Sequence, residues 1–215
     1  MPTNVTKKLS ALSTGVGLVL LCYMAYATIY GPYKTTFVHL AIFALCSFVA
    51  LFLDSIIQNI RSKFGILKNF SLLVASVSVL GYFIIEFERL INLWGSTYLS
   101  SWDILLGGLF VIICIEASWR QSLVLGALAV TSCLYMLFGD YLPGVFSHAG
   151  MDFERFIYIV VYTSEGLFGT GLKVAATYLF MFVILGSVLR VTKTGDFMID
   201  MANGLLGSKV GGAAK

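Results

Sequence analysis

Residues 162–189 read YTSEGLFGTGLKVAATYLFMFVILGSVL, and this stretch decides what kind of fold the chain has. Its second half is apolar and carries no charged side chain, which is the composition of a membrane-spanning helix. Its first half places one carboxylate, Glu165, next to glycines such as Gly166 and Gly169. Glycine permits backbone angles and close approaches that other residues do not. This half therefore predicts an irregular segment at the membrane edge, where protein or water satisfies its backbone groups.

The composition of the whole chain agrees with a membrane protein. Of its 215 residues, 59% are hydrophobic and 12% are charged, and the mean hydropathy is +0.92. Soluble domains carry about 25% charged residues, so we expect an all-α polytopic membrane protein in contact with lipid. At ~20 apolar residues per span, the length allows about six spans. The net charge of +3 is too small to indicate a nucleic-acid partner.

Six apolar runs predict six transmembrane helices, at residues 9–30, 35–53, 69–85, 104–115, 122–138 and 174–189. The fourth run is short, and we expect Asp103 and Glu116 to complete it near the two interfaces. Residues 151–161 and 194–206 mix charged and apolar side chains, which predicts amphipathic helices, the first of them lying on the membrane. The first run resembles a signal peptide, but its length favours a retained helix over removal of residues 1–27.

The basic residues predict the orientation of these spans. With the amino terminus in the cytoplasm, ten of the 14 lysines and arginines fall on the cytoplasmic side and four fall outside. Cytoplasmic loops normally carry the excess of positive charge. We therefore expect both termini to be cytoplasmic, in a multi-pass protein of the inner (plasma) membrane.

Few residues suggest chemistry. The histidines are His39 and His148, the four cysteines lie singly in apolar runs, and we find no catalytic or metal-binding motif. We therefore expect no enzymatic activity, no metal and no cofactor. One alternative is a haem or quinone membrane anchor in which the two histidines are axial haem ligands, and an absorbance spectrum would test it.

Glu116 and Arg120 stand four residues apart and so share a helix face. They form either a charged anchor to a partner helix or loop at the cytoplasmic interface, or an exposed pair whose arginine reaches to the interface. The pattern favours the exposed pair.

The glycine segment holds the only weak candidates for substrate binding, Glu165, Gly166, Gly169 and Thr170. Broken helices at membrane depth expose backbone dipoles to a bound ion or solute. The same glycines also suit a turn and a close helix contact, and Glu165 is placed either to pair with Lys173 or to cap a helix. The sequence does not choose between these interpretations.

Several short motifs follow one another from residue 103 onward. They are Glu116-Ala117 with Arg120, FGDYLPG at 138–144, His148 with Gly150, TSEGLFGT at 163–170, AATYLF at 175–180, Gly195-Asp196-Phe197 with Ile199-Asp200, and Gly211-Gly212 with Ala214-Lys215. In order and spacing they resemble the fused membrane component of tripartite ATP-independent periplasmic (TRAP) transporters, in which four small-subunit-like helices precede the large subunit. The resemblance covers about half of the chain, and residues 1–100 match it only in the number of helices.

The resemblance implies a sodium-coupled importer of carboxylate-like solutes. In that family a periplasmic solute-binding protein delivers the solute, the large subunit carries it by an elevator-type movement, and the small-subunit-like helices hold the scaffold still. The resemblance divides the chain into a four-helix region at 1–121, a connecting helix and external turn at 122–150, and the start of the large-subunit-like transport region at 151–215. Sodium is then the coupling ion, and the partners are the remaining large-subunit helices or a separate permease chain.

The sequence also departs from the family. Proline is usual at the places of Gly171 and Ala213, glycine at that of Lys173, and an acidic residue at that of Arg190. The chain ends at Lys215, before the hairpin that helps to bind sodium and solute in the family, so no such ligand is transferred to this sequence. We therefore expect an amino-terminal portion of a permease that needs a partner chain. The alternative is a non-transporting remnant or scaffold subunit that packs against other membrane helices.

Overall fold

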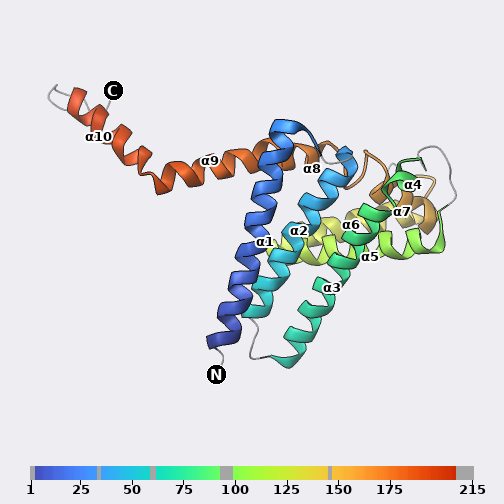
Figure 1. Cartoon of the computed structure of the whole chain (residues 1–215). Helices are drawn as coiled ribbons and strands as arrows, with labels where there is room; N and C mark the ends of the chain where they lie inside the picture. The colour runs from blue at the N-terminus through green and yellow to red at the C-terminus, as the bar shows by residue number, and fades with distance from the viewer. Residues whose placement is uncertain (1–2, 33–34, 59–61, 93–98, 145–146, 207–215) are drawn as a thin grey trace. The chain divides into compact units, whose positions relative to one another are not determined.

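The computed structural model describes residues 3–32, 35–58, 62–92, 99–144 and 147–206, which contain helices and no strand (Figure 1). The elements are α1 Thr3–Tyr30, α2 Thr36–Gln58, α3 Lys63–Ile85, α4 Phe87–Asn92, α5 Ser101–Gln121, α6 Leu123–Phe138, η1 Gly139–Tyr141, α7 Phe153–Tyr162, α8 Thr170–Val174, the π-helical turn η3 Ala175–Leu179, α9 Phe180–Val191 and α10 Thr194–Leu206.

Six helical segments among the described residues are long and apolar enough to cross a membrane, and each contains one of the predicted runs or most of it. They are Thr6–Tyr30, Thr36–Gln58, Lys63–Ile85, Ser101–Gln121, Leu123–Tyr141 and Thr170–Val191. The prediction of an all-α protein with six spans is thus confirmed. The orientation of the spans stays a prediction.

The third span begins earlier than its apolar run. The apolar run predicted for this span begins at residue 69 and leaves Lys63 and Lys68 outside it, whereas both lie in α3. Ser62 starts this helix, because its side-chain oxygen accepts the N–H of Gly65 at 3.2 Å and so satisfies one of the free donors of the first turn. The extra turns bring Lys68 within reach of α5, as described below.

By compactness the chain divides into two units, Met1–Lys173 and Val174–Lys215. The second unit contains η3, α9 and α10, and α10 has the bounds predicted for the second amphipathic helix. Lys193, which has a positive φ of 52°, separates α9 from α10. The glycine-containing motif at 211–215 lies outside the described residues. The threefold division implied by the family resemblance stays a prediction.

Within the first unit, α1, α2 and α3 run alongside one another (Figure 1). The helix α5 packs antiparallel to α3, because its first residues contact the end of α3 and its last turns contact the beginning of α3. The helix α6 folds back against α5 after the single residue Ser122. That hairpin needs Gly126, because a Cβ there would lie 2.8 Å from the Cα of Trp119.

The helix α7 is amphipathic as predicted, but its apolar face packs on protein. Phe156, Ile157 and Val161 are buried, and Gly107 of α5 is the notch that receives Ile157. A Cβ on Gly107 would lie 2.6 Å from Cγ2 of Ile157. The apolar face of α7 therefore packs on α5, and the expectation that this helix lies on the membrane stays a prediction.

Candidate functional site

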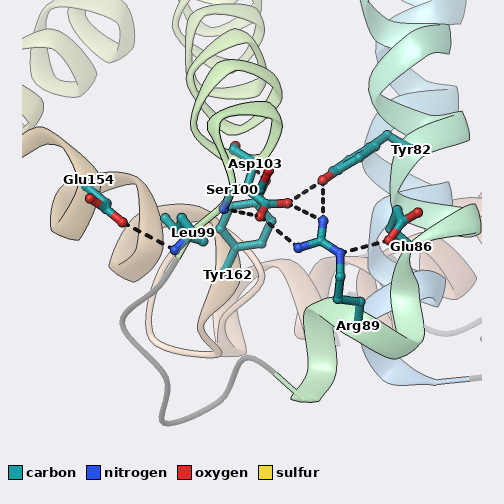
Figure 2. A network of polar contacts seen from close by, with 8 residues as sticks. All are labelled: Tyr82, Glu86, Arg89, Leu99, Ser100, Asp103, Glu154 and Tyr162. Carbon is teal, nitrogen blue, oxygen red and sulfur yellow. Dashed lines mark hydrogen bonds and ion pairs between the residues drawn. The ribbon is translucent and has the colours of Figure 1, made fainter.

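The end of α3, the short helix α4 and the start of α5 bring together one group of polar side chains, which we call the Arg89–Asp103 cluster. Figure 2 shows the guanidinium of Arg89 facing the carboxylate of Asp103, with Tyr82 and Glu86 beside them. Arg89 lies on α4, the short helix that follows α3. Because α5 runs back along α3, its third residue, Asp103, meets the end of α3.

Asp103 is fully buried, and both of its carboxylate oxygens are occupied. Oδ1 accepts hydrogen bonds from Tyr82 Oη and from Arg89 Nη2 at 2.7 Å, and Oδ2 accepts from Arg89 Nη1 at 2.9 Å and from the N–H of Ser100 at 2.7 Å. The bidentate guanidinium neutralises the buried charge, and the bond from Ser100 fixes the first turn of α5. A buried carboxylate is tolerated only with such partners.

Arg89 carries the balancing charge. Hydrogen bonds to Asp103 and then to Glu86 raise the pKa of its guanidinium, which therefore stays charged. Its Nε donates to Glu86 Oε2 at 2.8 Å, and its Nη2 also donates to Tyr82 Oη at 2.6 Å. Arg89 thus ties the last turn of α3 to the first turn of α5 through α4.

The same cluster also fastens α7. Tyr162 Oη donates to the backbone oxygen of Asp103 at 2.8 Å, and burial raises the pKa of this phenol, which stays protonated and able to donate. Nearby, the N–H of Leu99 donates to Glu154 Oε1 at 3.2 Å (Figure 2). Residues from α3, α4, α5 and α7 therefore meet in one connected network.

A second group lies at the other ends of α3 and α5, and we call it the Glu116–Arg120 cluster. Glu116 Oε1 lies 2.9 Å from Lys68 Nζ and accepts from Arg120 Nε, also at 2.9 Å. Arg120 Nη2 donates to Asn69 Oδ1 at 2.7 Å, and the guanidinium carbon stands 5.0 Å from the ring centroid of Phe52 on α2.

The interpretation of Glu116 and Arg120 as an exposed pair is wrong. Their side chains are only 24% and 20% exposed, because α3 covers them with Lys68 and Asn69. The alternative that the sequence also offered, an anchor to a partner helix, describes the contacts that these residues make. With the Arg89–Asp103 cluster, this cluster fastens the antiparallel pair α3 and α5 at both ends.

The glycine segment forms a tight turn between α7 and α8. A Cβ on Gly166 would collide with the carbonyl oxygen of Val160, and a Cβ on Gly169 would lie 2.9 Å from the carbonyl oxygens of Ser164 and Gly166. The N–H of Leu167 donates to the oxygen of Val160 at 2.7 Å. Two of the weak candidates for substrate binding, Gly166 and Gly169, are therefore needed for a close backbone turn.

The other two weak candidates, Glu165 and Thr170, are exposed. Glu165 uses its backbone N–H to donate to Thr163 Oγ1 at 3.3 Å, and Thr170 is the first residue of α8. The structure does not assign either side chain to one of the two polar clusters. Their role in binding a substrate stays a prediction.

The turn also inserts Phe168 into an aromatic core. Its ring stacks on Phe110 at a centroid distance of 5.2 Å and an interplanar angle of 6°, and it also contacts Phe83 and Phe37. Phe83 in turn meets Tyr162 edge to face at 6.1 Å. This core brings α2, α3, α5 and α7 together next to the Arg89–Asp103 cluster, because Phe83 follows Tyr82 and Tyr162 reaches Asp103.

The two histidines have structural partners. His148 accepts the N–H of Gly150 at Nδ1 (3.1 Å), so Nε2 carries the proton and donates to the oxygen of Tyr135 at 2.8 Å. His39 is buried, and its Nδ1 lies 3.2 Å from Tyr23 Oη on α1. Both ring nitrogens of His148 are thus engaged, which argues against the axial-haem interpretation. Among the described residues, no group of three or more His, Cys, Asp and Glu is arranged to hold a metal ion.

Sequence reasoning did not find the pair of Arg89 and Asp103. It placed Asp103 at the flank of the fourth apolar run and named no cation as its partner. The available signal was a carboxylate in the first turn of a short span, because such a charge requires a cation from a neighbouring helix end. A candidate for this cation was also visible in the sequence. Arg89 follows the third apolar run, and the charge distribution predicts that this end of the run is external, like the start of the span that carries Asp103.

Comparisons with models of protein families, with curated proteins and with solved structures found no match to this chain.

Proposed function

We propose that this chain belongs to the permease component of a sodium-coupled, TRAP-type importer of carboxylate-like solutes in the plasma membrane. The sequence motifs from residue 103 onward support the family. In this role residues of the first unit form a stationary scaffold, and a periplasmic solute-binding protein together with further permease helices completes the importer.

The observation that carries the proposal is the double fastening of α3 and α5. The Arg89–Asp103 cluster ties one end of the pair and the Glu116–Arg120 cluster ties the other. A helix pair that is fixed at both ends resists sliding and tilting, because either movement separates buried charges from their partners. An elevator-type importer needs a framework of this kind against which another part can move.

The second compact unit agrees with the same role. It begins at Val174, and its first turn is π-helical over Ala175–Leu179. Such turns are frequent at functional positions in helices, because they insert an extra residue into the backbone ladder. We propose that this unit leads into the part of the importer that handles the solute.

Deletion and re-expression in the native cell test the proposal. Uptake of a panel of radiolabelled mono- and dicarboxylates is measured in the parent strain, in the strain without this chain, and after re-expression of the full chain. We expect deletion to abolish uptake of at least one carboxylate, re-expression to restore it, and a sodium ionophore to remove it. Unchanged uptake of every carboxylate would overturn the proposal.

The double fastening also favours the second candidate, a non-transporting scaffold subunit. Both functions predict that the tagged full chain co-purifies with other membrane subunits. The scaffold function alone predicts that carboxylate uptake survives deletion of this chain while those subunits lose their assembly. The same deletion strain therefore separates the two candidates.

A further inference from the structure

A polar cavity opens beside the Glu116–Arg120 cluster. It has a volume of about 740 Å³ and lies between α2, α3 and α5. Its charged lining consists of Asp54, Lys68, Glu116 and Arg120, with Gln58 and Asn69 as polar neighbours. All of these residues belong to the first compact unit.

The cavity stands where three spans end. Gln58 is the last residue of α2, Lys68 and Asn69 lie in the second turn of α3, and Arg120 lies in the last turn of α5. Positions at the ends of transmembrane helices lie at the level of the lipid headgroups. The distribution of basic residues predicts that these ends face the cytoplasm. A ligand at this depth therefore meets the phosphate layer of the bilayer.

The four charged side chains of the cavity sum to zero net charge, but they do not use all of their hydrogen-bonding groups on one another. Glu116 receives both Lys68 and Arg120 on one oxygen, so these three residues together carry one net positive charge. Lys68 is 50% exposed, and its ammonium group has three N–H donors, one of which faces Glu116. Asp54, on the facing helix α2, is exposed and adds the balancing negative charge.

A net positive site next to a separate carboxylate suits a ligand that carries both signs of charge. We propose that this cavity binds the headgroup of a zwitterionic, amine-bearing phospholipid such as phosphatidylethanolamine. The phosphate lies against Lys68 and Arg120, and the ammonium group lies against Asp54. An anionic headgroup without an amine leaves Asp54 uncompensated, which is why we choose the zwitterionic class.

The acyl chains distinguish a lipid from a soluble phosphate ester. The helix that carries Glu116 exposes Ile112 and Leu105, which stand four and eleven residues before Glu116 on the same face. This apolar stripe runs from the level of the cavity along the span. A phospholipid therefore buries apolar surface on α5 that a free headgroup leaves uncovered. The inference does not depend on the transport function proposed above.

The test uses the purified full chain after removal of lipid in detergent. Binding of dioctanoyl phosphatidylethanolamine, dioctanoyl phosphatidylglycerol, glycerophosphoethanolamine and inorganic phosphate is measured by native mass spectrometry. We expect phosphatidylethanolamine to bind about tenfold more tightly than each of the other probes. Equal or tighter binding of phosphatidylglycerol would overturn the zwitterionic assignment. Equal binding of the soluble headgroup or of phosphate would show a phosphate-ester site rather than a lipid site.

Variants locate the binding. Asp54→Asn is expected to weaken binding of phosphatidylethanolamine about tenfold and not to weaken binding of phosphatidylglycerol. Lys68→Gln is expected to weaken both, and Lys63→Gln, on the same helix but outside the cavity, serves as the matched control. Because Asp54 is exposed, its variant keeps the fold, and its melting temperature without lipid verifies this. If Asp54→Asn and Lys68→Gln both bound like the parent protein, the cavity would not be the site.

Discussion

Arg89 binds both carboxylate oxygens of Asp103, yet the two side chains differ in their environment, since Asp103 is fully buried and Arg89 is 40% exposed. Loss of the arginine leaves a charge in a dry site, whereas loss of the carboxylate leaves a guanidinium that water and Glu86 can still satisfy.

We therefore expect Arg89→Ala to lower the free energy of unfolding by about 3–5 kcal/mol, and Asp103→Asn by about 1–3 kcal/mol. Both values are measured on the full chain by titration with sodium dodecyl sulfate, with tryptophan fluorescence as the readout. Arg155→Ala, at an exposed arginine of α7, is the control and should have little effect. A greater loss for Asp103→Asn than for Arg89→Ala would contradict the asymmetry.

The Glu116–Arg120 cluster predicts two unequal coupling energies. Glu116 and Arg120 are largely covered and joined by a charge-assisted hydrogen bond, so a double-mutant cycle with Gln at both positions should give about 1–2 kcal/mol. The pair of Glu116 and Lys68 is half exposed on the lysine side and should give less than about 1 kcal/mol. The same unfolding titration measures both cycles, and equal couplings would refute the ranking.

The glycine turn predicts that substitution by alanine has opposite effects on stability at two glycines that stand five residues apart. Gly166→Ala places a methyl group against the carbonyl oxygen of Val160 and should cost about 1–3 kcal/mol of stability. Gly171→Ala is the matched control, because a Cβ there meets open space within α8 and gains helix propensity of up to ~1 kcal/mol. Melting temperatures of the two purified variants should shift in opposite directions. A loss for Gly171→Ala as large as that for Gly166→Ala would show that the turn is not what Gly166 provides.

Tyr162 combines two roles that substitutions can separate. Tyr162→Phe keeps the ring in the aromatic core and removes only the hydrogen bond to the backbone of Asp103, at an expected cost of about 1 kcal/mol. Tyr162→Ala also removes the ring and should cost about 3–5 kcal/mol. Hydrogen exchange of α7 should increase in both variants, and the exposed Tyr178→Phe should leave α7 unchanged. Unaltered exchange of α7 in Tyr162→Ala would mean that this tyrosine does not hold the helix.

Features that depend on local composition could be predicted from the sequence. Hydropathy identified the six spans, and the mixture of charged and apolar residues identified α7 and α10. Hydropathy failed at the start of α3, because Ser62 and Lys68 extend a helix beyond its apolar part. Hydropathy alone assigns a polar residue at a helix end to a loop, because it does not show the partner of that residue on another helix.

Contacts between distant residues could not be predicted in the same way. The spacing of Glu116 and Arg120 indicated their own pair, but Asn69 stands 51 residues before Arg120 and nothing local points to it. Similarly, Arg89 and Asp103 are separated by 14 residues and a change of chain direction. The glycines near Gly166 indicated that two backbone segments come close together there. Only the fold shows that the second segment is the backbone at Val160.

The arrangement of α3, α4 and α5 has a consequence for how the chain enters a membrane during its synthesis. Both charged clusters join α5 to the helices that precede it, so each carboxylate of the two clusters on α5, Asp103 and Glu116, finds a cation on a segment that is made earlier. Asp103 then enters the bilayer already neutralised, in a hairpin whose tip carries Arg89. The insertion machinery therefore receives α3, α4 and α5 with their charges already paired, and a nascent chain that stops before α5 leaves Arg89 with Glu86 as its carboxylate partner and without Asp103.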